Sequence, residues 1–72
     1  GISKVSVTTE KTTNLSLEVS NMMGQKVFEI PAHKVNAGTH ILEINAENLV
    51  NGVYFYTVKA GNTSITKKMI VK

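Results

Sequence analysis

The residues that could do chemistry in this 72-residue chain are two histidines, five glutamates and a scatter of serines. His33 and His40 lie on either side of Gly38, and neither has a third ligand or a catalytic base nearby in sequence. Glu43 and Glu47 are close in sequence, but two carboxylates need a pocket before they can act as general acid and base. No serine stands in a Gly-x-Ser-x-Gly motif, and no glycine-rich phosphate-binding loop is present. The sequence therefore predicts a protein that is not an enzyme, with no catalytic site, metal site or cofactor.

The charged residues and the missing residue types narrow the choice of partner. Eight lysines and five glutamates, without arginine or aspartate, give a formal net charge of +3. Bidentate arginine dominates base reading and calcium loops depend on aspartate, so the composition argues against nucleic-acid and calcium binding. The absence of cysteine rules out disulfides and thiolate chemistry. No apolar run approaches the ~20 residues of a membrane span, and we expect no membrane insertion.

The length allows one small domain. A chain of 72 residues buries only about 60% of the surface that it exposes when unfolded, so its stability is marginal. There is also little volume for a ligand cavity. Because the chain opens on Gly1 rather than methionine, we expect residues 1–72 to be a single domain of a larger protein.

The strongest strand signal lies over residues 53–60, Val-Tyr-Phe-Tyr-Thr-Val-Lys-Ala, which suits a pleated and half-buried surface. An Asn-Gly pair opens this run and a Gly-Asn pair closes it, and both pairs are typical of tight turns. Strand alternation assigns Tyr54 and Tyr56 to the core face, because the opposite face carries Lys59. We expect these aromatic rings to pack in the core rather than to stack on a sugar.

Further strands are expected on either side of this one. Residues 3–9 and 64–71 indicate the first and last strands, and residues 15–20 show the clearest alternation of apolar and polar side chains. A strand over 25–30 has a mixed pattern that a β-bulge would reconcile. Pro31 either ends that strand or places it at a sheet edge, because proline has no N–H for a ladder.

The segment that follows Pro31 is expected to be less regular. Residues 32–37 indicate a connection, and Gly38 then begins a strand in which His40 is partly buried. The next segment is long enough for one helical turn capped by Asn45, with Leu49 closing the end of the core. Short strands at regular spacing, joined by turns, predict an all-β fold, namely a small antiparallel β-sandwich. A small barrel is the alternative.

Four short motifs follow one another along the chain: Asn-Met-Met-Gly-Gln-Lys-Val at 21–27, Ala-Gly-Thr-His at 37–40, Leu-Val-Asn-Gly-Val-Tyr-Phe at 49–55 and Lys-Lys-Met-Ile-Val-Lys at 67–72. In this order and spacing they resemble the C-terminal sorting domain of type IX secretion, the Por system of Bacteroidetes. The resemblance rests on the combination, since each motif alone is weak. Asn21 stands where that family often has aspartate. A Pro-Asn-Pro segment that often precedes the domain in that family is absent. Its absence is compatible with a first strand that is incomplete.

The resemblance implies an immunoglobulin-like β-sandwich of six to seven strands at the end of a larger secreted protein. In that family the domain directs an upstream cargo domain through the periplasm and across the outer membrane by way of the type IX translocon. A gingipain-like sortase then commonly removes it, ahead of the domain and so upstream of Gly1. The cargo is anchored to surface lipopolysaccharide or released. The implied partners are therefore the translocon, the sortase and the cargo, at the cell surface or outside the cell.

The resemblance also assigns roles to residues. It assigns structural roles in turns and core to Asn21, Gly24, Val27, Gly38, Leu49, Gly52 and Tyr54. It assigns recognition by the translocon to the C-terminal strand, residues Lys67, Lys68, Met69, Ile70, Val71 and Lys72. A strand edge with lysines can bind a partner by β-augmentation, and the same lysines can instead serve only to prevent aggregation. Exposed edges also allow a weak homodimer.

Two other functions fit a β-sandwich without a catalytic site. An immunoglobulin-like or fibronectin-like spacer of a secreted bacterial hydrolase would serve as well inside a chain as at its end. A carbohydrate-binding module would need exposed aromatic rings, and burial of Tyr54 and Tyr56 would argue against it.

Overall fold

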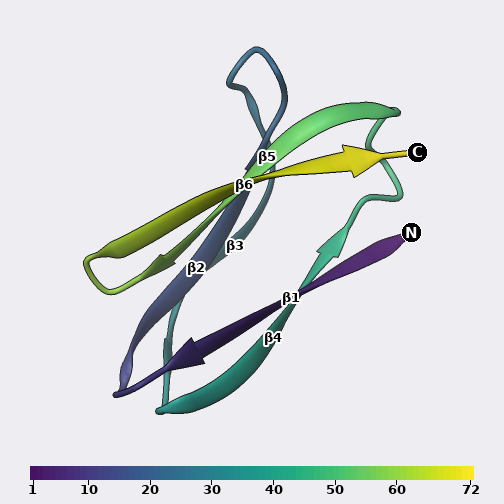
Figure 1. Cartoon of the computed structure of the whole chain (residues 1–72). Helices are drawn as coiled ribbons and strands as arrows, with labels where there is room; N and C mark the ends of the chain where they lie inside the picture. The colour runs from purple at the N-terminus through teal and green to yellow at the C-terminus, as the bar shows by residue number, and fades with distance from the viewer.

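The computed structural model describes the whole chain, Gly1–Lys72, as six antiparallel strands without a helix. The strands are β1 (Ile2–Thr9), β2 (Thr13–Ser20), β3 (Lys26–Val35), β4 (Gly38–Asn45), β5 (Gly52–Ala60) and β6 (Thr63–Val71). β1 and β4 form a two-stranded sheet, and the other strands form a four-stranded sheet in the order β3-β2-β5-β6. Figure 1 shows the two layers, with both termini at the same end. The predicted all-β sandwich is confirmed, and the sheet does not close into a barrel because β1 and β6 do not pair.

The core lies between the two sheets and is built on β2. Leu15, Leu17 and Val19 alternate with polar residues, and the structure buries these three side chains completely. β2 is an interior strand of the four-stranded sheet, so its apolar face is covered by the opposite layer. Leu42 and Ile44 of β4 are the buried apolar residues that this layer contributes. The apolar and polar side chains that alternate in the sequence of β2 therefore point to the inner and outer faces of the sandwich, respectively.

β5 follows the predicted alternation as well. Tyr54 and Val58 are buried, and Tyr56 is half-buried and packs against the core. On the opposite face, Phe55 and Lys59 are exposed. β5 lies between β2 and β6 in the four-stranded sheet, so the strongest strand signal in the sequence corresponds to an interior strand.

β3 is longer than the sequence predicts. A strand over 25–30 and a connection over 32–37 are expected, whereas β3 continues through Pro31 to Val35. The connection to β4 shrinks to Asn36-Ala37, so the expected connection is wrong. β3 is an edge strand, and its outer side has no partner strand to which a backbone N–H could donate. Proline is therefore tolerated within it.

Two irregularities in the pairing of β3 explain its mixed apolar pattern. Val19 pairs with Phe28 and Ser20 with Lys26, which leaves Val27 as an extra residue that is 38% exposed. A second register shift lies beside the proline. Bulges of this kind are common at sheet edges, and the bulge that would reconcile the two faces of the strand is present.

The connection between β4 and β5 is a turn rather than the expected helical turn. The Oδ1 atom of Asn45 accepts a hydrogen bond of 3.0 Å from the backbone N–H of Glu47, so Asn45 does cap the segment. A single backbone bond of 3.0 Å, from the N–H of Leu49 to the carbonyl of Ala46, closes it. One such bond makes a β-turn. Leu49 packs against this end of the core.

Replacing Leu17 by alanine tests the position of the core. We expect Leu17→Ala to lower the free energy of unfolding by about 2–5 kcal/mol, because it removes most of a fully buried side chain. Denaturant unfolding followed by circular dichroism measures the change. The control is Ile41→Ala on β4, where the side chain is 55% exposed. Its effect should stay within about 1 kcal/mol, and equal losses in both variants would contradict this assignment of the core.

Candidate functional site

The two histidines each contact a backbone carbonyl. The Nδ1 atom of His33 is 3.0 Å from the carbonyl oxygen of Pro31, and the Nε2 atom of His40 is 2.7 Å from that of Asn36. Each ring nitrogen therefore donates to a nearby backbone carbonyl. His40 is half-buried on β4, as the sequence predicts. No three side chains of metal-binding type lie together.

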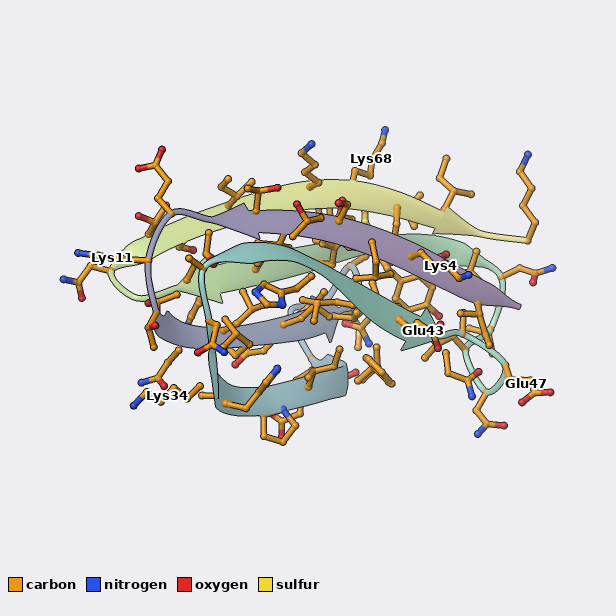
Figure 2. All side chains as sticks on the ribbon, turned by 90° about the horizontal axis from the view of Figure 1, so that it is seen from below. Lys4, Lys11, Lys34, Glu43, Glu47 and Lys68 are labelled. Atoms are coloured by element: carbon orange, nitrogen blue, oxygen red, sulfur yellow. The ribbon has the colours of Figure 1, made fainter.

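Glu43 and Glu47, the two carboxylates that are close in sequence, are both exposed. Glu43 lies opposite Lys4 in the β1–β4 ladder, and Glu47 extends from the β4–β5 turn (Figure 2). Lys26 and Glu29 form an ion pair with an Nζ–Oε2 distance of 3.1 Å, and both side chains are about half exposed. The hydrogen bond to Glu29 and its negative charge raise the pKa of Lys26 above its ordinary value. These contacts are between charged groups that solvent reaches.

The first motif folds into the β2–β3 turn around the side chain of Asn21. Its Oδ1 atom accepts hydrogen bonds from the backbone N–H of Met23 at 2.9 Å and of Gln25 at 3.0 Å. Its Nδ2 atom donates to the side chain of Gln25 at 2.9 Å. Gly24 has a φ of 83°, a backbone conformation that residues with a side chain rarely adopt. Its N–H donates a hydrogen bond of 3.0 Å to the carbonyl of Asn21. Asn21 and Gly24 thus determine this turn together.

In the third motif, a side chain of β5 forms a hydrogen bond with the loop that precedes the strand. Tyr54 is 4% exposed, and its hydroxyl donates a hydrogen bond of 2.7 Å to the carbonyl of Val50. A tyrosine hydroxyl bonded to upstream backbone is a feature of immunoglobulin-type sandwiches. The sequence marks Tyr54 as a core residue but does not identify this bond. The predicted burial of Tyr54 was the signal that could have identified the bond, because a buried hydroxyl needs a hydrogen-bond partner.

The aromatic rings do not form a binding platform. Tyr54 is buried, and Tyr56 and Phe28 are half-buried and pack against the core. Phe55 is the exposed aromatic residue, at 37%. A carbohydrate-binding module depends on several exposed rings, so the structure lacks the feature that this alternative needs.

The fourth motif lies on β6, which is the free edge of the four-stranded sheet. Val71 is buried and Met69 is half-buried against the core, so these two side chains anchor the strand. The side chains of the motif that stay exposed are Lys67, Lys68, Ile70 and Lys72. The structure therefore divides the motif into residues that pack and residues that a partner can reach.

Asn21 offers a test of how the first motif works. We expect Asn21→Ala to lower the free energy of unfolding by about 1–2 kcal/mol, because two backbone N–H groups lose their acceptor. Asn21→Asp keeps an oxygen in that place and should change stability by less than about 0.5 kcal/mol. Denaturant unfolding of both variants gives the comparison. An aspartate variant as unstable as the alanine variant would show that the oxygen is not what holds the turn.

The hydroxyl of Tyr54 can be tested by removing one atom. Tyr54→Phe keeps the buried ring but loses the bond to Val50, and we expect it to lower the unfolding free energy by about 1 kcal/mol. Tyr56→Phe is the matched control on the same strand and should have a smaller effect. Thermal unfolding of the three proteins measures the difference. A larger loss from the control would contradict this role for the bond.

Comparison with known proteins adds an independent observation. The family model described as secretion system C-terminal sorting domain matches residues 2–72. The match includes β1, which none of the four motifs covers. No curated protein and no solved structure gave a match. The structure also contains no helix with the length and hydropathy to cross a membrane. Because the family model covers nearly the whole chain, the chain belongs to the secretion system C-terminal sorting domains of type IX secretion.

Proposed function

We propose that this domain is a non-catalytic sorting signal in which the exposed edge of β6 is the part that the type IX translocon reads. Membership of the family assigns the domain to export across the outer membrane, with a cargo in the same chain. The cargo then reaches the cell surface or the exterior. The observation that carries the finer proposal is the contrast between the two edges of the four-stranded sheet.

β6 is a regular edge and β3 is not. β6 pairs with β5 in an unbroken register, from Gly52 opposite Val71 to Ala60 opposite Thr63. The backbone groups on its free side are therefore spaced as another strand requires, which suits β-augmentation. β3 carries Pro31 and two register shifts, and such features prevent an edge from pairing further. A partner strand would therefore bind β6 more readily than β3.

The side chains of β6 support recognition as well as protection. Lysines on an edge strand prevent aggregation, and that role alone would account for Lys67 and Lys68. It does not account for Ile70, which is 58% exposed. On the outer face, Ile70 lies opposite Val53 and Lys68 lies opposite Phe55. Ile70, Val53 and Phe55 therefore lie next to one another beside Lys68. A contiguous exposed apolar patch with a polar rim marks a surface that contacts another protein.

We also propose that a sortase removes the domain after export, at a bond upstream of Gly1. The carbonyl of Gly1 accepts a hydrogen bond of 2.9 Å from the N–H of Ala46. The fold therefore holds the chain from its first residue onward. A cut ahead of Gly1 would leave all six strands intact and release the cargo. The family resemblance supports this step.

Secretion of a reporter tests the sorting role. A fluorescent protein with its own signal peptide is fused upstream of residues 1–72 and expressed in a Bacteroidetes host with and without a working type IX translocon. We expect export only in the strain with the translocon. Retention in the periplasm of both strains, with the domain folded, would support the spacer alternative instead.

Variants of the same reporter test the role of β6. Deleting residues 67–72 should abolish export, but it also removes Val71 from the core. The decisive variant therefore combines Lys67→Thr, Lys68→Thr and Ile70→Thr, which changes exposed side chains only. We expect it to reduce export nearly to the level of the strain without the translocon.

The matched control places the same kind of change on the opposite edge of the sheet. It combines Lys26→Thr, Val27→Thr and Lys34→Thr on β3, where all three side chains are exposed. Export of this control should stay normal. Normal export of the β6 variant, or equal loss in both variants, would contradict recognition through β6.

A further inference from the structure

The surface of the domain is hollowed along one line, between β1 and β6. Three hollows of about 360, 370 and 150 Å³ follow these two strands from one end of the sandwich to the other. β1 and β6 are edge strands of different sheets and do not pair with each other. Figure 1 shows the two strands on the same side of the molecule, with the N- and C-termini at one end of the gap.

The middle hollow, called here the β1–β6 groove, has an apolar floor. It is lined by residues 4–8 of β1, Tyr56 and Val58 of β5, and Ile65 and Lys67 of β6. Ile65 lies opposite Val58 and therefore points to the core side of the sheet. Val58 is 8% exposed, whereas Ile65 is 55% exposed. The two-stranded sheet thus covers β5 here but leaves the Ile65 end of β6 uncovered.

The charges of the β1–β6 groove have one sign. Lys4 and Lys67 are the charged residues that line it, and no carboxylate does so. Lys68 follows Lys67 along the strand, so one lysine points to each face of the sheet. Opposite charges on neighbouring strands attract and like charges repel. The best complement to β6 is therefore a strand with two consecutive acidic residues, flanked by β-branched residues that pack beside Ile65 and Met69.

We propose that the β1–β6 groove binds an extended strand of another protein, which pairs with β6 and places two adjacent carboxylates beside Lys67 and Lys68. This proposal rests on the proposed function and extends it, because it specifies the chemistry of the partner strand that binds β6. A second copy of this chain fits less well. Antiparallel pairing of two β6 strands over their full length would place Lys67 opposite Lys67. An inward-pointing lysine on an edge strand also opposes pairing with an apolar edge.

Binding of a designed peptide tests this inference. The probe is a dye-labelled peptide, Thr-Val-Val-Glu-Glu-Thr-Val-Thr, which matches β6 in antiparallel register. Fluorescence anisotropy measures its binding to the complete chain of residues 1–72, and hydrogen exchange reports which backbone amides it protects. We expect saturable binding that protects amides of β6. A peptide with Lys-Lys in place of Glu-Glu should bind at least about tenfold more weakly.

A charge reversal provides the specific control. Lys67→Glu should weaken binding of the Glu-Glu peptide about tenfold and strengthen binding of the Lys-Lys peptide. Lys34→Glu makes the same change in net charge on β3, and Lys34 lies on the opposite side of the molecule from Lys68 (Figure 2). It should leave the binding of both peptides nearly unchanged. Both positions are exposed, so circular dichroism should show native folds for both variants.

Three results would overturn the inference. Equal weakening by Lys67→Glu and Lys34→Glu would mean that the peptide responds only to net charge. Protection of the β6 amides without peptide, together with a dimer in sedimentation, would identify a second copy as the occupant. No saturable binding to the folded chain would exclude the acidic strand. The titration uses no translocon, so absent binding alongside export that depends on β6 would remove this inference and leave the proposed function standing.

Discussion

A two-stranded sheet can cover only part of a four-stranded one, and the arrangement of this domain follows from that mismatch. The interior strands β2 and β5 lie under the cover, and Leu15, Leu17 and Val19 are completely buried there. β6 lies at the margin, so its inward side chains range from buried at Val71 to 55% exposed at Ile65. A domain of this size has a small hydrophobic core. The strand that carries the C-terminal motif thus uses few of its side chains for packing.

The motifs that mark the family divide into two kinds when they are placed on the structure. Asn21 and Gly24 hold the β2–β3 turn, and Tyr54 bonds to the loop before its own strand. Folding alone explains these positions. Lys68 and Ile70 are exposed on a free edge and contribute nothing to the core. This division separates the part of the motif set that builds the domain from the part that is available to a partner.

Local rules were sufficient to predict most of the strands, because side-chain alternation and turn chemistry depend on neighbouring residues. They located the buried row that begins at Leu15 and the two turns that bound β5. They left two interpretations of Pro31 open, a strand end or a sheet edge, and the structure has the sheet edge. They could not choose between the two, because whether a proline ends a strand depends on which strand lies beside it. That is decided by pairing between segments far apart in sequence. The β1–β6 groove was unpredictable for the same reason, since it arises from how many strands each layer contains.

The central claim is that the exposed edge of β6 is the surface that the translocon contacts. Site-specific photo-crosslinking during export tests it most directly, with a photoreactive amino acid in place of Ile70 in an exported reporter. We predict a covalent adduct between that position and a translocon component. We predict none from Val27, which is 38% exposed on the opposite edge of the same sheet. Equal adducts from both positions, or an adduct from Val27 alone, would contradict the claim.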